Sequence, residues 1–170
     1  MRYRLELRNY CADSIIEHES VSRVVQEMSD FFLKDQVIVV TGAAGGIGRA
    51  ICEDLSEAGA KIVLAGRNAD TLKETADSLK IADSLIVSTD ITKPESVKSL
   101  LDATLAKFTR IDGLINNAGG GSSMKKPEET PHEEWVRMID FNLTGTFNCC
   151  IEFGKHMISQ KYGKIVNISS

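Results

Sequence analysis

Hydrophobic residues recur in short blocks from residue 36 onward, with helix-like patterns between them. Five apolar runs predict strands, at Val37–Val40, Ile62–Leu64, Leu85–Val87, Leu114–Ile115 and Ile165–Ile168. The runs are continuously apolar, which is typical of a parallel sheet that is covered by helices on both faces. The alternation of strand and helix predicts an α/β fold, a doubly wound parallel sheet of the Rossmann type with about five strands.

Two of the helix-like patterns have clear limits. One ends before Gly59, and the other follows Pro94. Proline suits the first turn of a helix, and Asp90 or Thr92 is expected to cap that helix.

The longest helical pattern runs from about Pro131 to Met157. Gly145 lies in its middle, where glycine costs roughly 1 kcal/mol relative to alanine, so we expect a kink or a close helix approach there. The side chains expected to form a packing stripe are Trp135, Met138, Ile139, Phe147, Cys150, Ile151 and Met157.

Residues 1–30 differ from the rest, because valines and other apolar residues recur there at the spacing of an amphipathic helix. Two interpretations stay open: a native N-terminal extension, or upstream sequence that precedes a true start at Met28. The folded domain is expected to occupy residues 31–170.

Composition indicates an ordinary globular protein, with 42% hydrophobic and 26% charged residues in 170. The net charge of -4 gives no reason to expect nucleic acid or an anionic membrane as a partner. No apolar run approaches the roughly 20 residues of a membrane span, and no signal-peptide pattern is present, which favours a cytoplasmic location. The four cysteines form no CxxC pair and the histidines are scattered, which predicts free thiols and no metal site.

The most informative motif is TGAAGGIG at residues 41–48, between the first predicted strand and a helical stretch. Its glycines are spaced as Gly42-x3-Gly46-x-Gly48. Such a turn brings the backbone close to a phosphate and points free N–H groups of a helix N-terminus at it. A side chain at Gly46 would intrude where a pyrophosphate lies. The position between strand and helix favours a dinucleotide site over a purely structural turn.

Arg67 follows the second predicted strand, nineteen residues after Gly48. An acidic residue in this region would bind the ribose 2′-hydroxyl of NAD, whereas arginine accommodates the 2′-phosphate of NADP. Gly66 leaves no carboxylate to repel that phosphate. NADP is therefore favoured over NAD, and a solvated surface arginine is the alternative.

Further segments follow in a recognisable order. They are Asp90-Ile91-Thr92, Asn116-Asn117-Ala118-Gly119, Phe141-Asn142-Leu143-Thr144-Gly145 and the final stretch Gly163-Lys164-Ile165-Val166-Asn167-Ile168-Ser169-Ser170. With TGAAGGIG before them, the chain from about Leu33 to Ser170 resembles the N-terminal, cofactor-binding portion of the short-chain dehydrogenase/reductase family.

The resemblance implies roles for these residues. Asp90 and Ile91 would lie against the adenine, and Asn116 would help fix the sheet. Asn142 would hold a water of the proton relay at a helix kink, and Ser170 would bind the substrate oxygen. The implied cofactor-binding set is Gly42, Gly46, Ile47, Gly48, Arg67, Asp90, Ile91, Asn117, Ala118 and Gly119. Each has a structural alternative: Asp90 as a helix cap, Asn142 as a tolerated polar residue, Ser170 as a plain strand end.

The family's tyrosine, with a lysine four residues later, is expected about a dozen residues beyond the serine. Neither Tyr3, Tyr10 nor Tyr162 has a lysine at that spacing. We therefore interpret the chain as an incomplete enzyme that is truncated before the Tyr-x-x-x-Lys motif and has negligible turnover by itself. The run Ile165–Ile168 would then be an unprotected apolar edge, so residues 1–170 alone are expected to aggregate or to need a complementing partner.

The resemblance thus implies an NAD(P)-dependent oxidoreductase that exchanges hydride between NADP(H) and an alcohol or ketone. Sugars or polyols and 3-oxoacyl thioesters both fit as substrates. The family also implies a homo-oligomer, a dimer or tetramer formed through the long helix. The alternatives are a catalytically inactive dinucleotide-binding module and a non-functional truncated product.

Overall fold

The computed structural model describes residues 32–81, 83–121 and 126–169. The expected N-terminal helix and Ser170 lie outside the described residues.

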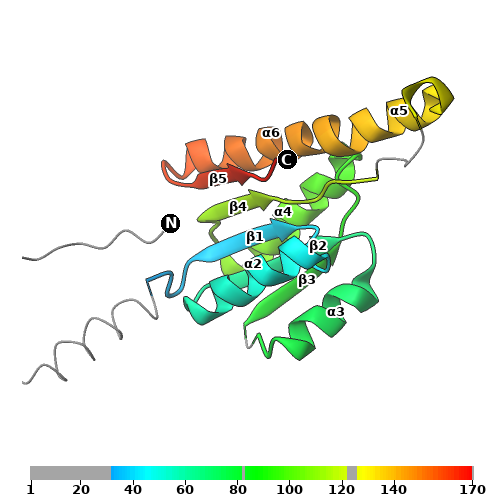
Figure 1. The fold of residues 1–170 in the computed structure, drawn as a ribbon. Coiled ribbons are helices and arrows are strands. Elements are labelled where there is room, and N and C mark those ends of the chain that lie inside the picture. The colour runs from blue at the N-terminus through cyan, green and yellow to red at the C-terminus, as the bar shows by residue number, and fades with distance from the viewer. Residues whose placement is uncertain (1–31, 82, 122–125, 170) are drawn as a thin grey trace, which may run out of the picture.

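A single five-stranded parallel sheet forms the centre of the described fold (Figure 1). Its spatial order is β3-β2-β1-β4-β5. The strands are β1 (Val37–Thr41), β2 (Lys61–Gly66), β3 (Ser84–Ser88), β4 (Gly113–Asn116) and β5 (Lys164–Asn167). Four predicted apolar runs lie within these strands and the fifth extends one residue past β5, so the predicted doubly wound Rossmann-type sheet is confirmed.

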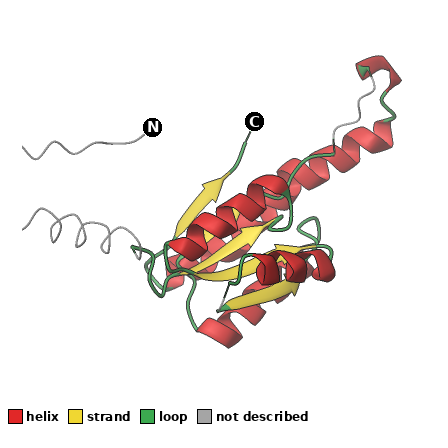
Figure 2. Cartoon of the chain, turned by 60° about the horizontal axis from the view of Figure 1, so that its bottom comes forward, coloured by secondary structure: helices red, strands yellow, loops and turns green. Residues whose placement is uncertain are grey.

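Helices cover both faces of the sheet (Figure 2). One buried cluster joins the sheet to α2 (Gly46–Glu57) and α3 (Ala69–Ser78) through Cys52 and Leu72. A second cluster joins the other face to α4 (Pro94–Phe108) and α6 (Gly145–Ser159) through side chains such as Leu100 and Phe153. The remaining elements are η1 (Pro127–Glu129), α5 (His132–Ile139) and η2 (Asp140–Thr144).

The long predicted helix is interrupted. Between α5 and α6 the chain forms one π-helical segment, η2. A π-helical turn holds an extra residue, so the side chains after it are rotated relative to those before it. The predicted packing stripe is wrong at three of its seven positions, because Trp135, Phe147 and Ile151 are exposed. The side of α6 that is buried carries Gly145, Cys149, Phe153 and Met157.

Gly145 starts α6 at a point where the helix passes close to Ile91. A Cβ at Gly145 would lie 2.6 Å from both Cγ1 and Cδ1 of Ile91. The close approach expected for this glycine is therefore confirmed, and the glycine directly follows the π-helical segment.

The start of α4 differs from the prediction. Pro94 occupies the first turn as expected, but the N-cap residue is Lys93, and no side chain caps the helix. Asp90 and Thr92 form a turn just before it instead, in which the Asp90 carboxylate accepts a hydrogen bond from the Thr92 hydroxyl at 2.8 Å.

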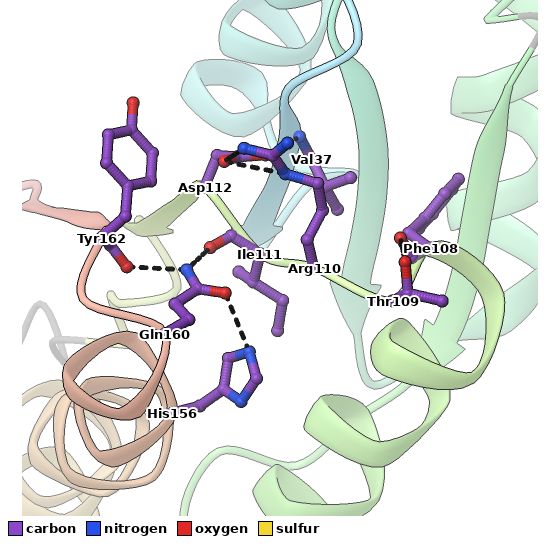
Figure 3. Close-up of polar contacts among 9 residues, drawn as sticks. All are labelled: Val37, Phe108, Thr109, Arg110, Ile111, Asp112, His156, Gln160 and Tyr162. Atoms are coloured by element: carbon purple, nitrogen blue, oxygen red, sulfur yellow. Dashed lines mark hydrogen bonds and ion pairs between the residues drawn. The ribbon is translucent and has the colours of Figure 1, made fainter.

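Hydrogen bonds fasten the amino end of the sheet (Figure 3). The buried carboxylate of Asp112 accepts from the backbone N–H of Val37 at 2.8 Å and from Arg110. The side-chain amide of Gln160 donates to the carbonyl oxygens of Ile111 and Tyr162, which ties the end of α6 to the start of β4.

β5 is an edge strand of the sheet and has partly exposed apolar side chains. Val166 is 49% exposed and Ile165 is 36% exposed. This agrees with the expected apolar edge. None of the described helices is long and apolar enough to cross a membrane.

Candidate dinucleotide site

A cavity of about 560 Å³ opens at the carboxyl ends of the strands. It lies where the strand order reverses between β1 and β4, which is where open α/β sheets bind ligands. Its walls come from the turn after β1, the end of β2 and the loops after β3 and β4. The predicted cofactor residues that line it are Gly42, Gly46, Ile47, Gly48, Arg67, Ile91, Asn117, Ala118 and Gly119.

The glycine turn is shaped by close contact with the loop after β4. Gly42 has a φ of +65°, which disfavours any other residue. A Cβ at Gly48 would overlap the Gly42 carbonyl oxygen and lie 2.6 Å from the side-chain amide nitrogen of Asn117. These two glycines are therefore required by the fold of the turn itself.

Gly46 is different, because a Cβ there would meet nothing within 4 Å. It is the first residue of α2, whose N-cap is Gly45, and within the described chain that helix has neither a side-chain cap nor an acidic residue in its first turn. Free backbone N–H groups at a helix N-terminus attract an anion. An open cradle of this kind fits the pyrophosphate of a dinucleotide.

Thr41 and Asn117 connect the two strands at the reversal point. The Thr41 hydroxyl accepts hydrogen bonds from the backbone N–H groups of Asn117 and Ala118, each at 3.1 Å. It also donates to the carbonyl oxygen of Ile115 at 3.3 Å. The Asn117 side chain donates to the carbonyl oxygens of Thr41 and Gly42. This network holds the loop after β4 against the glycine turn.

Arg67 extends from the end of β2 into the cavity wall. Its guanidinium lies over the ring of Phe141, 5.1 Å from the centroid. The preceding residue, Gly66, contributes no carboxylate. A Cβ at Gly66 would lie 3.4 Å from Leu72, an ordinary contact, so a side chain fits there.

Asp90 and Ile91, in the loop after β3, line different cavities. Ile91 is buried and lines the main cavity. Asp90 instead lines a neighbouring cavity of about 630 Å³. The hydrogen bond from the Thr92 hydroxyl is the main cause that holds the pKa of Asp90 below its ordinary value, against the opposing effect of burial. Asp90 thus does not cap α4, which was its structural alternative, but forms a turn with Thr92 and lines this cavity.

Asn142 lies in η2 and fastens the helix to the loop after β4. Its Oδ1 accepts from the N–H of Gly120 at 2.7 Å. Its Nδ2 donates to the carbonyl oxygens of Gly120 and Met138. Asn116 pairs with Asn167 on β5, donating to its side-chain oxygen at 2.8 Å.

Among the residues that the structure describes, no group of three or more His, Cys, Asp or Glu side chains is arranged to hold a metal ion.

The amino-acid sequence of residues 36–170, which includes the glycine turn and the loop after β4, matches the family model of the short chain dehydrogenases. The chain belongs to the short-chain dehydrogenase family.

Relatives of this chain are named as oxidoreductases or dehydrogenases. An uncharacterized oxidoreductase of Staphylococcus aureus strain MRSA252 is 41% identical over 138 residues, which are 81% of this chain and 59% of that protein. A Listeria innocua protein named NAD-dependent glycerol dehydrogenase is 38% identical over 141 residues, 83% of this chain and 55% of that protein. The chain thus spans less than two thirds of the length of these relatives.

Solved structures agree with this assignment. A short-chain type dehydrogenase/reductase from Mycobacterium marinum superposes with a TM-score of 0.79 at 31% identity, covering 86% of this chain and 59% of that one. A metagenomic short-chain oxidoreductase in complex with NADP gives 0.75 at 34% identity, covering 81% and 63%.

Thr41 and Phe141 also belong to the site, although no role was expected of either side chain from the sequence. Thr41 is a polar residue that ends an otherwise apolar strand, directly before the glycine turn, and that position was a usable signal. Phe141 had no such signal, because its contact with Arg67 depends on the π-helical turn.

Proposed function

We propose that the protein is an NADP-preferring short-chain oxidoreductase that exchanges hydride between NADP(H) and a small alcohol or ketone. Arg67 carries the cofactor part of this proposal. The relatives differ in their cofactor, since one is named NAD-dependent and the crystal structure of another is a complex with NADP. The proposed preference for NADP over NAD therefore rests on residues of this chain. Arg67 places a positive guanidinium at the end of β2, and the preceding Gly66 adds no negative charge.

Different residues of the cavity would bind different parts of the dinucleotide. The backbone of Gly42, Gly46 and Gly48 with the start of α2 would bind the pyrophosphate, and Ile47 would cover it. Ile91 would pack against the adenine, with Asp90 beside it. Asn117, Ala118 and Gly119 would contact the ribose. The dinucleotide, when bound, supplies the hydride-carrying nicotinamide.

Asn142 and Ser170 are the proposed catalytic residues of this chain. Asn142, held to Gly120 and Met138, would keep a water in the proton relay. Ser170 would hydrogen-bond the substrate oxygen. Sugars or polyols and 3-oxoacyl thioesters both fit such a centre.

Proton transfer to the substrate oxygen would need a tyrosine with a lysine four residues on, a pair absent from these 170 residues. We therefore propose that the 170-residue chain alone has negligible turnover. Sequencing about 20 codons past Ser170 tests whether the full-length protein is the proposed enzyme. A tyrosine with a lysine four residues later supports the enzyme, and an open frame without the pair rejects it.

Two alternatives have the same cofactor site. An inactive dinucleotide-binding module would bind NADP without turnover in its full-length form. A non-functional truncated product would be indicated by a stop codon directly after Ser170.

We also propose a homo-oligomer, a dimer or tetramer, that forms through α5 and α6. The exposed apolar side chains of this helical run support it, namely Trp135, Val136, Leu143, Phe147, Ile151 and Ile158. A cytoplasmic location belongs to the same proposal and is supported by the free thiols of Cys52, Cys149 and Cys150, which suit a reducing compartment.

A further inference from the structure

Arg67 and Phe141 form the wall between two cavities. Both residues line the dinucleotide cavity of about 560 Å³, and both line the neighbouring cavity of about 630 Å³. The arginine side chain is exposed, whereas Phe141 is partly buried against the core. The orientation of the guanidinium therefore decides which cavity receives its positive charge.

The neighbouring cavity competes for that charge. Besides Arg67, its lining has three acidic residues, Asp90, Glu133 and Asp140, against one further arginine, Arg137, and one histidine, His132. Asp90 already interacts electrostatically with Arg67, because Arg67 is one of the groups that lower the pKa of this carboxyl. A flexible arginine would therefore be drawn toward the carboxylates and away from a phosphate in the first cavity.

Phe141 opposes this movement, since its ring lies under the guanidinium with a centroid distance of 5.1 Å. Arginine stacks on aromatic faces through the negative charge of the ring face. The ring is itself held in place. The next residue, Asn142, is bonded to Gly120 and Met138, and Phe141 packs against the buried cluster that includes Phe153.

We infer that Phe141 is a positioning residue that holds the Arg67 guanidinium toward a ribose 2′-phosphate, and so sets the preference for NADP over NAD. This inference rests on the proposed function. An arginine that is already positioned loses less conformational entropy when it binds a ligand. The resulting gain in affinity applies to NADP, whose 2′-phosphate the arginine would bind, and the affinity for NAD stays the same.

The test measures dissociation constants of NADPH and NADH for the wild-type protein and its variants, from the fluorescence of the reduced nucleotides. Phe141→Leu removes the ring and keeps an apolar side chain. We expect it to lower the NADPH-over-NADH preference about two- to fivefold, the range of an exposed cation–π contact, with NADH affinity unchanged. Phe141→Tyr keeps a ring and should keep the preference.

Two controls isolate the contact. Phe147→Leu makes the same change on an exposed ring of α6 and should leave the NADPH-over-NADH preference unchanged. In an Arg67→Ala background, Phe141→Leu should not change the preference further. Phe141→Met is a second variant without a ring, for use if the leucine variant does not fold, and NADH binding verifies folding in every case.

Three results would overturn the inference: an unchanged preference in Phe141→Leu, an equal loss of NADPH and NADH affinity, or the same loss in the Arg67→Ala background. A wild-type protein without any preference for NADPH would instead reject the proposed cofactor, and this is seen before any variant is compared.

Discussion

Asn117 and Thr41 are joined by two hydrogen bonds at the point where the strand order of the sheet reverses. The N–H of Asn117 donates to the Thr41 hydroxyl, and the Asn117 side chain donates to the Thr41 carbonyl oxygen, both at 3.1 Å. The same side chain also reaches the carbonyl oxygen of Gly42. These hydrogen bonds hold the loop after β4 and the glycine turn together.

Asn117→Ala would leave the carbonyl oxygens of Thr41 and Gly42 without this donor. We expect the free energy of unfolding in urea to fall by about 1–3 kcal/mol. The dissociation constant of NADPH should rise as well, because the glycine turn loses its support.

Gln160→Ala is the matched control. The Gln160 amide also bridges two carbonyl oxygens, but at the amino end of the sheet (Figure 3). This variant should lose comparable stability and keep the wild-type affinity for NADPH. Equal loss of affinity in both variants would contradict a local role for Asn117.

Gly145→Ala tests the close approach of α6 to Ile91. Alanine normally favours a helix, but here its Cβ would lie 2.6 Å from the Ile91 side chain. We expect the free energy of unfolding to fall by about 1–3 kcal/mol through overpacking. In an Ile91→Ala background most of this cost should disappear, as a double-mutant cycle would measure. The same cost in both backgrounds would show that the contact is not the cause.

The two buried thiols give a prediction about pH. Burial raises the pKa of Cys52 and of Cys149 from 9.0 to about 12. At about pH 8 iodoacetamide should label the partly exposed Cys150 well before either of them, as mass spectrometry of the native protein can measure.

The sign of the effect on stability follows from linkage. Above about pH 9 the unfolded chain has released the thiol protons that the folded chain retains, so the stability contributed by these groups falls as the pH rises. Replacing Cys149 with alanine should weaken this alkaline loss in denaturant titrations. A loss that stays the same would argue against the raised pKa.

Phe147 tests the proposed oligomer. Its ring is 61% exposed on α6, so Phe147→Glu should not unfold the protein. In light scattering we expect the mass to shift toward the monomer, because a carboxylate in an apolar interface is costly. Phe32→Glu makes the same kind of change at another side chain, one that is 67% exposed, and should leave the mass unchanged. Equal behaviour of the two variants would count against this interface.

The sequence was sufficient for the sheet and for half of the cavity lining. The apolar runs are local signals, and the turn at Gly42 to Gly48 follows a strand directly, so both can be recognised without tertiary structure. The buried side of α6 was missed for a physical reason. Phe147 and Ile151 are apolar but exposed, and the π-helical turn before Gly145 changes the register on which a helical stripe depends.

Contacts between side chains that are distant in the sequence could not be predicted from the sequence either. One alternative for Asp90 was a cap on α4, whereas its carboxylate accepts a hydrogen bond from the Thr92 hydroxyl in a turn before that helix. The position of Phe141 beside Arg67 depends on how η2 packs, and a single sequence contains no direct signal for that.

The most direct test of the account compares the binding of NADPH and NADH to the wild-type protein and to the double variant Gly66→Asp with Arg67→Ala. The double variant introduces the carboxylate that would bind a ribose 2′-hydroxyl and removes the guanidinium that would bind the 2′-phosphate. We predict that the wild type binds NADPH more tightly and that the ratio of dissociation constants moves toward NADH by about 10- to 100-fold in the variant. No saturable binding of either nucleotide, or the same ratio in both proteins, would contradict the account.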